Sequence, residues 1–126
     1  MSNQKVNSST HLIMKSDIAL ITEELIRFRE ERDWGQFHDS KNLATAISIE
    51  AAELNELFLW KTIKESDEMS NEKVREELAD VLAFCFLLAH RRGLDIQEII
   101  LDKVRLNGQK YPVDKAKGNA KKYTEL

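Results

Sequence analysis

Apolar residues recur at steps of three and four along most of the chain, and this periodicity constrains the fold more than any other feature. It runs through four segments: 17–32, 43–60, 71–92 and 95–112. Four glycines and one proline leave little turn chemistry for β-hairpins, whereas Leu, Ala, Glu and Lys favour helix. The 126 residues suffice for one domain with a single core. The sequence therefore predicts an all-α fold, a four-helix bundle.

Capping residues stand at several of the expected helix ends. Ser16 can cap a first helix that begins at Asp17, because its side-chain oxygen can accept from a free backbone amide. Gly93 follows the third segment and suits the residue that ends a helix. Asp95 opens a capping-box pattern for the fourth helix, which should stop at Pro112.

Composition divides the chain into three parts. We expect a flexible N-terminal tail over 1–16, a helical domain over 17–112 and a basic C-terminal tail over 113–126. The polar stretch 64–70 is expected to be a loop. The longest apolar run, 81–89, is far shorter than the ~20 residues of a membrane helix. The N-terminal tail lacks a signal-peptide core, so a soluble, cytoplasmic protein is expected.

Charge and cysteine content exclude further classes. The 19 Lys and Arg against 22 Asp and Glu give a net charge of -3, which argues against binding to nucleic acid or to a membrane surface. The single cysteine, Cys85, cannot form an intrachain disulfide and lies among apolar neighbours. An inert core thiol in a reducing compartment is expected.

Acidic side chains interrupt the apolar faces of the second and third predicted helices. At about 100° per residue, Glu50 projects into the middle of the second helix's stripe and Glu53 lies at its margin. The same projection places Glu77 inside the third helix's stripe with Asp80 beside it, and turns Glu76 nearly opposite. The stripes are formed by Leu43, Ile47, Leu54 and Leu57, and by Val74, Leu78, Val81, Cys85 and Leu88. Two E-x-x-[ED] pairs should therefore face each other, while Glu56 points towards solvent.

Such a cluster requires a compensating charge. Burying unpaired carboxylates costs several kcal/mol each, and clustering them adds repulsion. An all-oxygen set favours a hard cation such as Mg²⁺, with Mn²⁺ as a possible substitute, whereas zinc would require His or Cys at ligand spacing. The carboxylates Glu50, Glu53, Glu77 and Asp80 are thus the candidate metal ligands, and one of them would activate water.

Two other interpretations remain open from the pattern alone. In the first, the acids pair with Lys or Arg on the surface of a non-enzymatic helical interaction module. A carboxylate-bridged di-iron bundle is disfavoured, because it expects Glu-x-x-His pairs and Asp80 stands where the histidine should follow Glu77.

Candidate substrate-binding residues lie outside the two acidic helices. Lys103, Asn107, Lys110 and Tyr111 repeat at helical steps and can present donors to a triphosphate along one face, or form a solvated basic face.

The two tryptophans, Trp34 and Trp60, each lie near a helix end, where an indole can stack on a base or pack in the core. His38 can hydrogen-bond a base edge or cap a turn.

The order and spacing of these motifs resemble the MazG-like nucleotide pyrophosphohydrolases, and within them the dCTP pyrophosphatase branch, over 32–123. The resemblance rests on seven groups of residues. These are Arg32-Asp33-Trp34-Gly35-Gln36-Phe37-His38, Asn42-Leu43-Ala44, Glu50-Ala51-Ala52-Glu53-Leu54, Leu57-Phe58-Leu59-Trp60, Glu77-Leu78-Ala79-Asp80-Val81, Lys103 with Asn107, and Lys110-Tyr111-Pro112. An E-x-x-E motif alone would be weak evidence.

The resemblance implies an all-α, oligomeric enzyme that splits a nucleoside triphosphate into monophosphate and pyrophosphate. It implies Mg²⁺ binding through the four carboxylates and a house-cleaning role on dCTP or modified dCTP-type nucleotides. Family members are dimers or tetramers whose sites are completed by neighbouring subunits. The resemblance also assigns 34–38, Trp60 and Phe84 to the nucleotide pocket, and favours phosphate binding by the lysine–asparagine helix.

Two positions depart from the dCTP-preferring relatives that the chain resembles. Those relatives carry His where Leu25 stands and Tyr where Phe84 stands. Both differences remove a polar group from the expected base pocket. They bear on the choice of base more than on the type of reaction.

Overall fold

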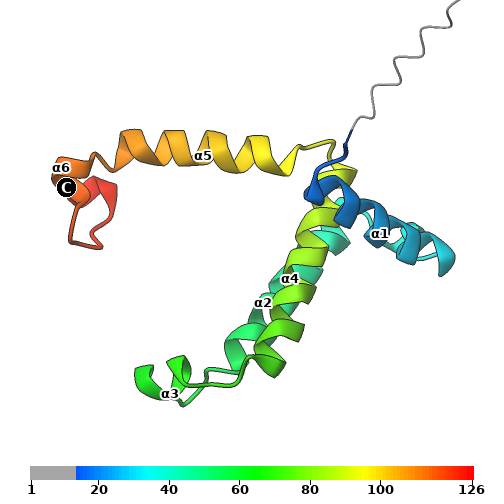
Figure 1. Ribbon diagram of the computed structural model, residues 1–126, viewed down its shortest axis with the longest axis horizontal. Helices are drawn as coiled ribbons and strands as arrows, with labels where there is room; N and C mark the ends of the chain where they lie inside the picture. The colour runs from blue at the N-terminus through cyan, green and yellow to red at the C-terminus, as the bar shows by residue number, and fades with distance from the viewer. Residues whose placement is uncertain (1–13) are drawn as a thin grey trace, which may run out of the picture.

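The computed structural model describes residues 14–126 and shows an all-α chain whose four main helices confirm the predicted fold class (Figure 1). Residues 1–13 of the predicted N-terminal tail lie outside the described part. The elements are α1 (Asp17–Glu31), η1 (Gly35–Phe37), α2 (Ser40–Glu56), α3 (Ile63–Asp67), α4 (Asn71–Arg91), α5 (Ile96–Lys110), α6 (Val113–Ala116) and η2 (Tyr123–Glu125). No described helix combines the length and the apolar character needed to cross a membrane.

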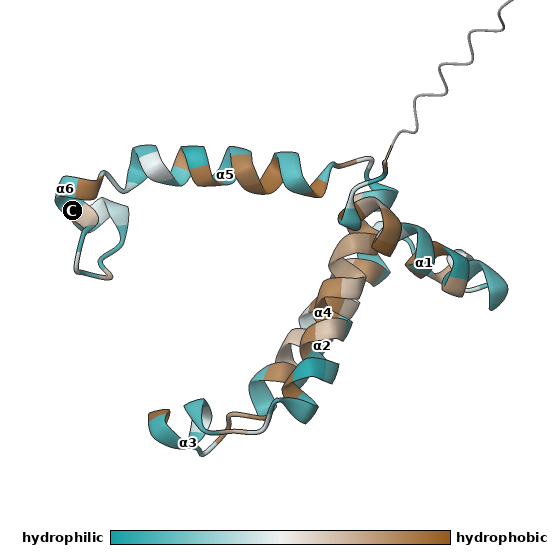
Figure 2. Ribbon diagram, in the orientation of Figure 1, coloured by the Kyte–Doolittle hydropathy of each residue, from teal (hydrophilic) through white to brown (hydrophobic). Residues whose placement is uncertain are grey.

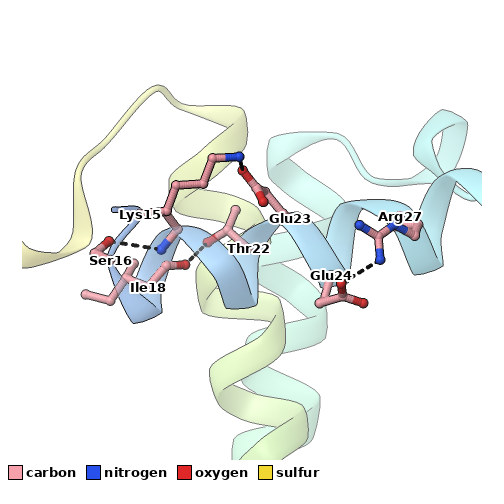
Figure 3. A network of polar contacts seen from close by, with 8 residues as sticks. Lys15, Ser16, Ile18, Thr22, Glu23, Glu24 and Arg27 are labelled. Carbon is pink, nitrogen blue, oxygen red and sulfur yellow. Dashed lines mark hydrogen bonds and ion pairs between the residues drawn. The ribbon is translucent and has the colours of Figure 1, made fainter. Parts of the chain in front are cut away.

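Side-chain caps set the starts of the long helices. The Ser16 hydroxyl accepts from the Ala19 amide at 3.2 Å, as predicted for α1 (Figure 3). The Asp95 carboxylate accepts from the Glu98 amide at 2.8 Å and begins α5. At α2 the cap is Asp39, so this helix begins three residues before the predicted Leu43.

The predicted loop over 64–70 is wrong in its first half, because α3 forms there. Thr62 caps this short helix by accepting from the Glu65 amide at 3.1 Å, and its hydroxyl donates to the Glu65 carboxylate at 3.0 Å. The T-x-x-E spacing is that of a capping box, which satisfies helix-end donors locally even in a polar segment. A five-residue helix needs no apolar stripe, so the periodicity gave no sign of it.

An antiparallel pair, α2 and α4, forms the body of the molecule, and α1 packs against α4 near the end where α4 finishes (Figure 1). The most deeply buried apolar side chains lie at that end: Leu43 is 1% exposed, Leu87 6% and Ala89 7%. The core is therefore small and lies where the first turns of α2 meet the last turns of α4.

The fourth main helix, α5, projects away from the α2–α4 pair instead of lying alongside it (Figure 1). Its apolar side chains are exposed, including Ile100 at 55% and Val104 at 59% (Figure 2). The chain has 10976 Å² of accessible surface, whereas a compact monomer of this size has about 6,900 Å². Part of this excess is the apolar surface that α5 leaves uncovered.

The segment after α5 turns back on the end of that helix. Tyr123 in η2 packs edge-to-face against Tyr111, with ring centroids 5.9 Å apart. The Lys110 ammonium lies 4.9 Å from the centroid of the Tyr123 ring. Within 113–126, predicted as a basic tail, the structure thus contains α6 and η2 and an aromatic contact to the preceding helix.

Candidate functional site

Three carboxylates from the two packed helices meet halfway along the pair. Glu50 and Glu53 extend from α2 and Glu77 from α4, and one oxygen from each lies within 4.8 Å of the others. Residues three apart share a helix face, so the tight packing of α2 on α4 is enough to bring the two pairs together. The predicted convergence is confirmed for Glu50, Glu53 and Glu77.

The carboxylates of Glu50 and Glu77 are only partly exposed, and one oxygen of each lacks a hydrogen-bond partner. Glu50 Oε2 and Glu77 Oε2 are buried without a hydrogen bond within the described chain. Burial raises the pKa of Glu50, and the neighbouring Glu53 and Asp80 raise it further. Burial likewise raises the pKa of Glu77, followed by the charges of Glu53 and Asp80.

Asp80 stands one turn after Glu77 and is exposed. Its charge reaches both Glu50 and Glu77, although its carboxylate is not among the three that converge most closely. Glu56 and Glu76, which the helical projection set aside, are exposed. None of the four candidate ligands takes part in an ion pair among residues 14–126, which speaks against the surface salt-bridge interpretation.

Metal-free protein should respond to pH in a direction set by these shifts. A carboxyl whose folded-state pKa lies above its ordinary value of 4.5 stabilises the fold below that value, and this contribution is lost as pH rises through the folded-state pKa. Lowering the pH from 7 towards about 5 should therefore raise the melting temperature of metal-free wild-type protein relative to a Glu50→Gln/Glu77→Gln variant. Calorimetry of both proteins in chelator checks this, and parallel pH profiles would contradict it.

A largely apolar cavity of about 350 Å³ adjoins the acidic cluster. It is bounded by α1, the segment before α2, and α4. Asp80 lines this cavity, and its charge also acts on Glu50 and Glu77. Phe28 and Trp34 pack edge-to-face there at 5.8 Å between centroids, and His38 and Phe84 at 6.2 Å. The lining residues are Leu25, Phe28, Arg29, Trp34, His38, Asp80, Ala83, Phe84 and Leu87.

Arg29 is a cavity residue that the sequence reasoning missed. Its side chain is 14% exposed and is held by Glu30, whose carboxylate accepts from Arg29 Nε at 3.1 Å and from Nη2 at 2.8 Å. Arg29 stands one turn after Leu25 on α1, which is the only sequence signal that could have included it. Gly35 lies beside this ion pair. A Cβ at position 35 would lie only 3.3 Å from the Glu30 carboxylate, so glycine leaves room for Arg29 and Glu30.

Trp60 does not reach this cavity within the chain. Trp34 precedes α2 and Trp60 follows it, and the 17 residues of α2 span about 25 Å at 1.5 Å per residue. Trp60 is 92% exposed and has a φ of 65°, which is rare for a bulky residue. The two tryptophans that were both predicted to lie near a base are therefore separated by the length of a helix.

The predicted phosphate-binding residues of α5 are also separated from the carboxylates. Lys103, Asn107 and Lys110 lie on α5, which extends away from the α2–α4 pair (Figure 1). Tyr111 caps the far end of that helix. One chain therefore holds the acidic cluster and the apolar cavity together, and carries its predicted phosphate-binding residues elsewhere.

Comparison of the sequence with known proteins relates this chain to one family. Residues 45–126 match the sequence model of the MazG-like family. The proteins named dCTP pyrophosphatase 1 from Mus musculus and Homo sapiens are each 40% identical over 104 residues, which is 79% of this chain and 61% of theirs. The chain thus spans less than two thirds of the length of these relatives.

A solved structure of a protein of comparable size is similar to this chain in both sequence and fold. The crystal structure of a pyrophosphatase from Archaeoglobus fulgidus is 36% identical in sequence and superimposes with a TM-score of 0.73. The similarity covers 79% of this chain and 95% of the archaeal one.

Proposed function

The chain belongs to the MazG-like family, and we propose that it hydrolyses a nucleoside triphosphate to the monophosphate and pyrophosphate. The observation that carries this proposal is the pair of buried, unpartnered carboxylate oxygens on Glu50 and Glu77. Such atoms are costly to bury without a compensating cation. The names of the relatives, dCTP pyrophosphatase 1 and pyrophosphatase, support the reaction type.

A hard divalent cation fits the donor set. Glu50, Glu53 and Glu77 would hold it directly, with Asp80 completing the set from the next turn of α4. All donors are carboxylate oxygens, which suits Mg²⁺, and Mn²⁺ can take its place. Bound there, the metal would neutralise phosphate charge and favour departure of pyrophosphate.

The chain's own carboxylates can then handle the proton. A water held beside the cluster attacks the α-phosphorus in line, so that a new P–O bond forms there as the anhydride bond between the α- and β-phosphates breaks. One of the four carboxylates, that of Glu50, Glu53, Glu77 or Asp80, would accept the proton of this water as general base. Pyrophosphate leaves with the bridging oxygen, and positioning of the water supplies much of the rate.

The adjoining cavity would receive the base. Trp34 and Phe84 offer aromatic surface for stacking, and His38 offers a ring nitrogen. Because Asp80 borders both the cavity and the acidic cluster, a base seated there would place its triphosphate towards the carboxylates. A deoxycytidine-type nucleotide is the proposed substrate on the strength of the relatives' names.

A second copy of the chain would complete the site. Trp60 lies outside the cavity of its own chain. The residues Lys103, Asn107 and Lys110 lie on α5, which projects from the α2–α4 pair with apolar side chains exposed. A dimer or tetramer would cover these surfaces and could bring the basic residues of one copy to the triphosphate bound by another. Homo-oligomerisation is therefore part of the proposed function.

The reaction is tested by incubating purified protein with Mg²⁺ and a panel of deoxynucleoside triphosphates, and measuring pyrophosphate. Release of pyrophosphate and monophosphate in equal amounts is expected. Release of orthophosphate instead would place the cleavage at another bond. No turnover of any nucleotide, with either Mg²⁺ or Mn²⁺, would refute the proposal and favour a non-enzymatic interaction module.

A further inference from the structure

The cavity beside the acidic cluster contains few polar groups able to distinguish one base from another. Leu25, Phe28, Ala83, Phe84 and Leu87 contribute hydrocarbon to its wall. An apolar wall discriminates weakly between bases of similar size, because it gains or loses little when a polar substituent changes. Within one chain, discrimination between bases then depends on the charged and polar lining residues.

Two of these polar residues are already engaged. Arg29 donates through Nε and Nη2 to the Glu30 carboxylate, which holds the guanidinium against its own helix. Asp80 is committed to the acidic cluster in the proposed function, since its charge acts on both Glu50 and Glu77. His38 is the remaining ionisable side chain in the lining, and Trp34 can only donate through its indole N–H.

The His38 ring is held in place, but its tautomer is not. Its backbone amide donates to the Gly35 carbonyl at 3.2 Å, and its ring packs edge-to-face on Phe84. Nδ1 is buried without a partner, and no hydrogen bond to the other described residues engages Nε2. The tautomer of a neutral histidine is normally fixed by the hydrogen bond that one nitrogen makes. Here the chain supplies none, so either nitrogen can carry the proton.

The ring is also neutral near pH 7. Burial lowers the pKa of His38 from its usual 6.5, and the nearby charge of Arg29 lowers it further. A neutral imidazole has one donor nitrogen and one acceptor nitrogen. Because Nδ1 is buried, Nε2 is the nitrogen that a base can reach. With the proton on Nε2 the ring can donate to a keto oxygen, and with the proton on Nδ1 it can accept from an amino group at Nε2.

We infer that His38 reads the edge of the bound base through a switchable tautomer, so that this site accepts amino and keto forms of the same base alike. The inference rests on the proposed function, because it concerns the base of the same nucleotide. A fixed donor or acceptor rejects the mismatched partner by about 10⁴-fold or more. An adaptable imidazole surrounded by hydrocarbon should discriminate by no more than about tenfold.

Matched pairs of nucleotides test this inference directly. dCTP and dUTP differ at one amino or keto position of a pyrimidine, and dATP and dITP differ in the same way in a purine. For whichever pair is hydrolysed, kcat/KM should agree within about tenfold. A preference of 10³-fold or more within a hydrolysed pair would overturn the inference while leaving the hydrolase intact. Absence of pyrophosphate from all four would instead refute the proposed function, and the inference with it.

A histidine variant separates base reading from folding. His38→Leu should lower kcat/KM for both members of a pair by about tenfold, through KM, and leave their ratio unchanged. His90→Leu is the matched control, since His90 is exposed and outside this cavity, and it should retain wild-type rates. A change in the ratio caused by His38→Leu would show a fixed reading and contradict the inference.

The tautomer itself can be observed. In protein labelled with ¹⁵N at histidine, the His38 ring should show shifts intermediate between the two neutral forms in the absence of nucleotide. The dCTP and dUTP analogues with a nonhydrolysable α,β-linkage should move them in opposite directions. A single tautomer that persists with both analogues would overturn the inference.

Discussion

Glu77→Gln is expected to lower kcat/KM for pyrophosphate release by at least ~10² and to raise the melting temperature of the metal-free protein. Both effects have one cause. Glu77 Oε2 is buried without a partner, and burial and the charges of Glu53 and Asp80 raise the pKa of this carboxyl. A neutral amide of the same shape relieves that repulsion, but it weakens the site as a ligand set for a cation.

The neighbouring Glu76 provides the control. Glu76→Gln removes the same charge one residue away, from an exposed position on the opposite side of α4. We expect near wild-type turnover from this variant. Steady-state pyrophosphate release and calorimetry in chelator distinguish the two variants. Equal losses of activity in the two variants would mean that only the total negative charge of α4 matters, not its position. Normal turnover by Glu77→Gln would refute the proposed metal site.

Mixing two inactive variants should restore about a quarter of wild-type activity if each site combines two chains. One variant is Glu77→Gln, which leaves α5 intact. The other is Lys103→Met/Asn107→Leu, which leaves the carboxylates intact. In a mixed dimer, one site would then receive unaltered carboxylates from one copy and an unaltered α5 from the other.

The expectation follows from the position of α5. It projects from the α2–α4 pair with Ile100 and Val104 exposed, and its basic residues lie away from the acids of the same chain. The variants are unfolded together, refolded and assayed, with differential tags to verify mixed oligomers. Glu77→Gln mixed with Glu50→Gln is the control and should recover nothing, because both changes fall in the same half of the site. Verified mixed oligomers without activity in the first mixture would contradict sharing of the site.

The comparison of Glu76 with Glu77 shows how far local periodicity reaches. Spacing alone allowed either residue to pair with Asp80, and rotation about the helix axis selected Glu77. The structure brings Glu77 to Glu50 and Glu53 and leaves Glu76 exposed. The selection was possible because the direction of a helical side chain depends only on residues a few positions away.

Helix ends were predictable where a cap stood beside an apolar stripe. Ser16 and Asp95 cap α1 and α5 in this way. The start of α2 at Ser40, capped by Asp39, and the short helix capped by Thr62 were missed, because their first turns carry few apolar residues. A polar segment can be helical on the strength of capping alone, and periodicity does not detect it.

Sequence by itself determined the four main helices, because helix formation depends on residues within a few turns. It also determined that Glu50, Glu53 and Glu77 lie on the facing sides of two helices, and hence the acidic cluster, because this depends only on two adjacent packed faces. Only the tertiary structure decided which of the other candidates lie near that cluster. It placed His38 and Arg29 around a cavity and left Trp60 and α5 apart from it. The physical reason is that the path of the chain between helices sets distances across the molecule, and no periodic pattern encodes that path.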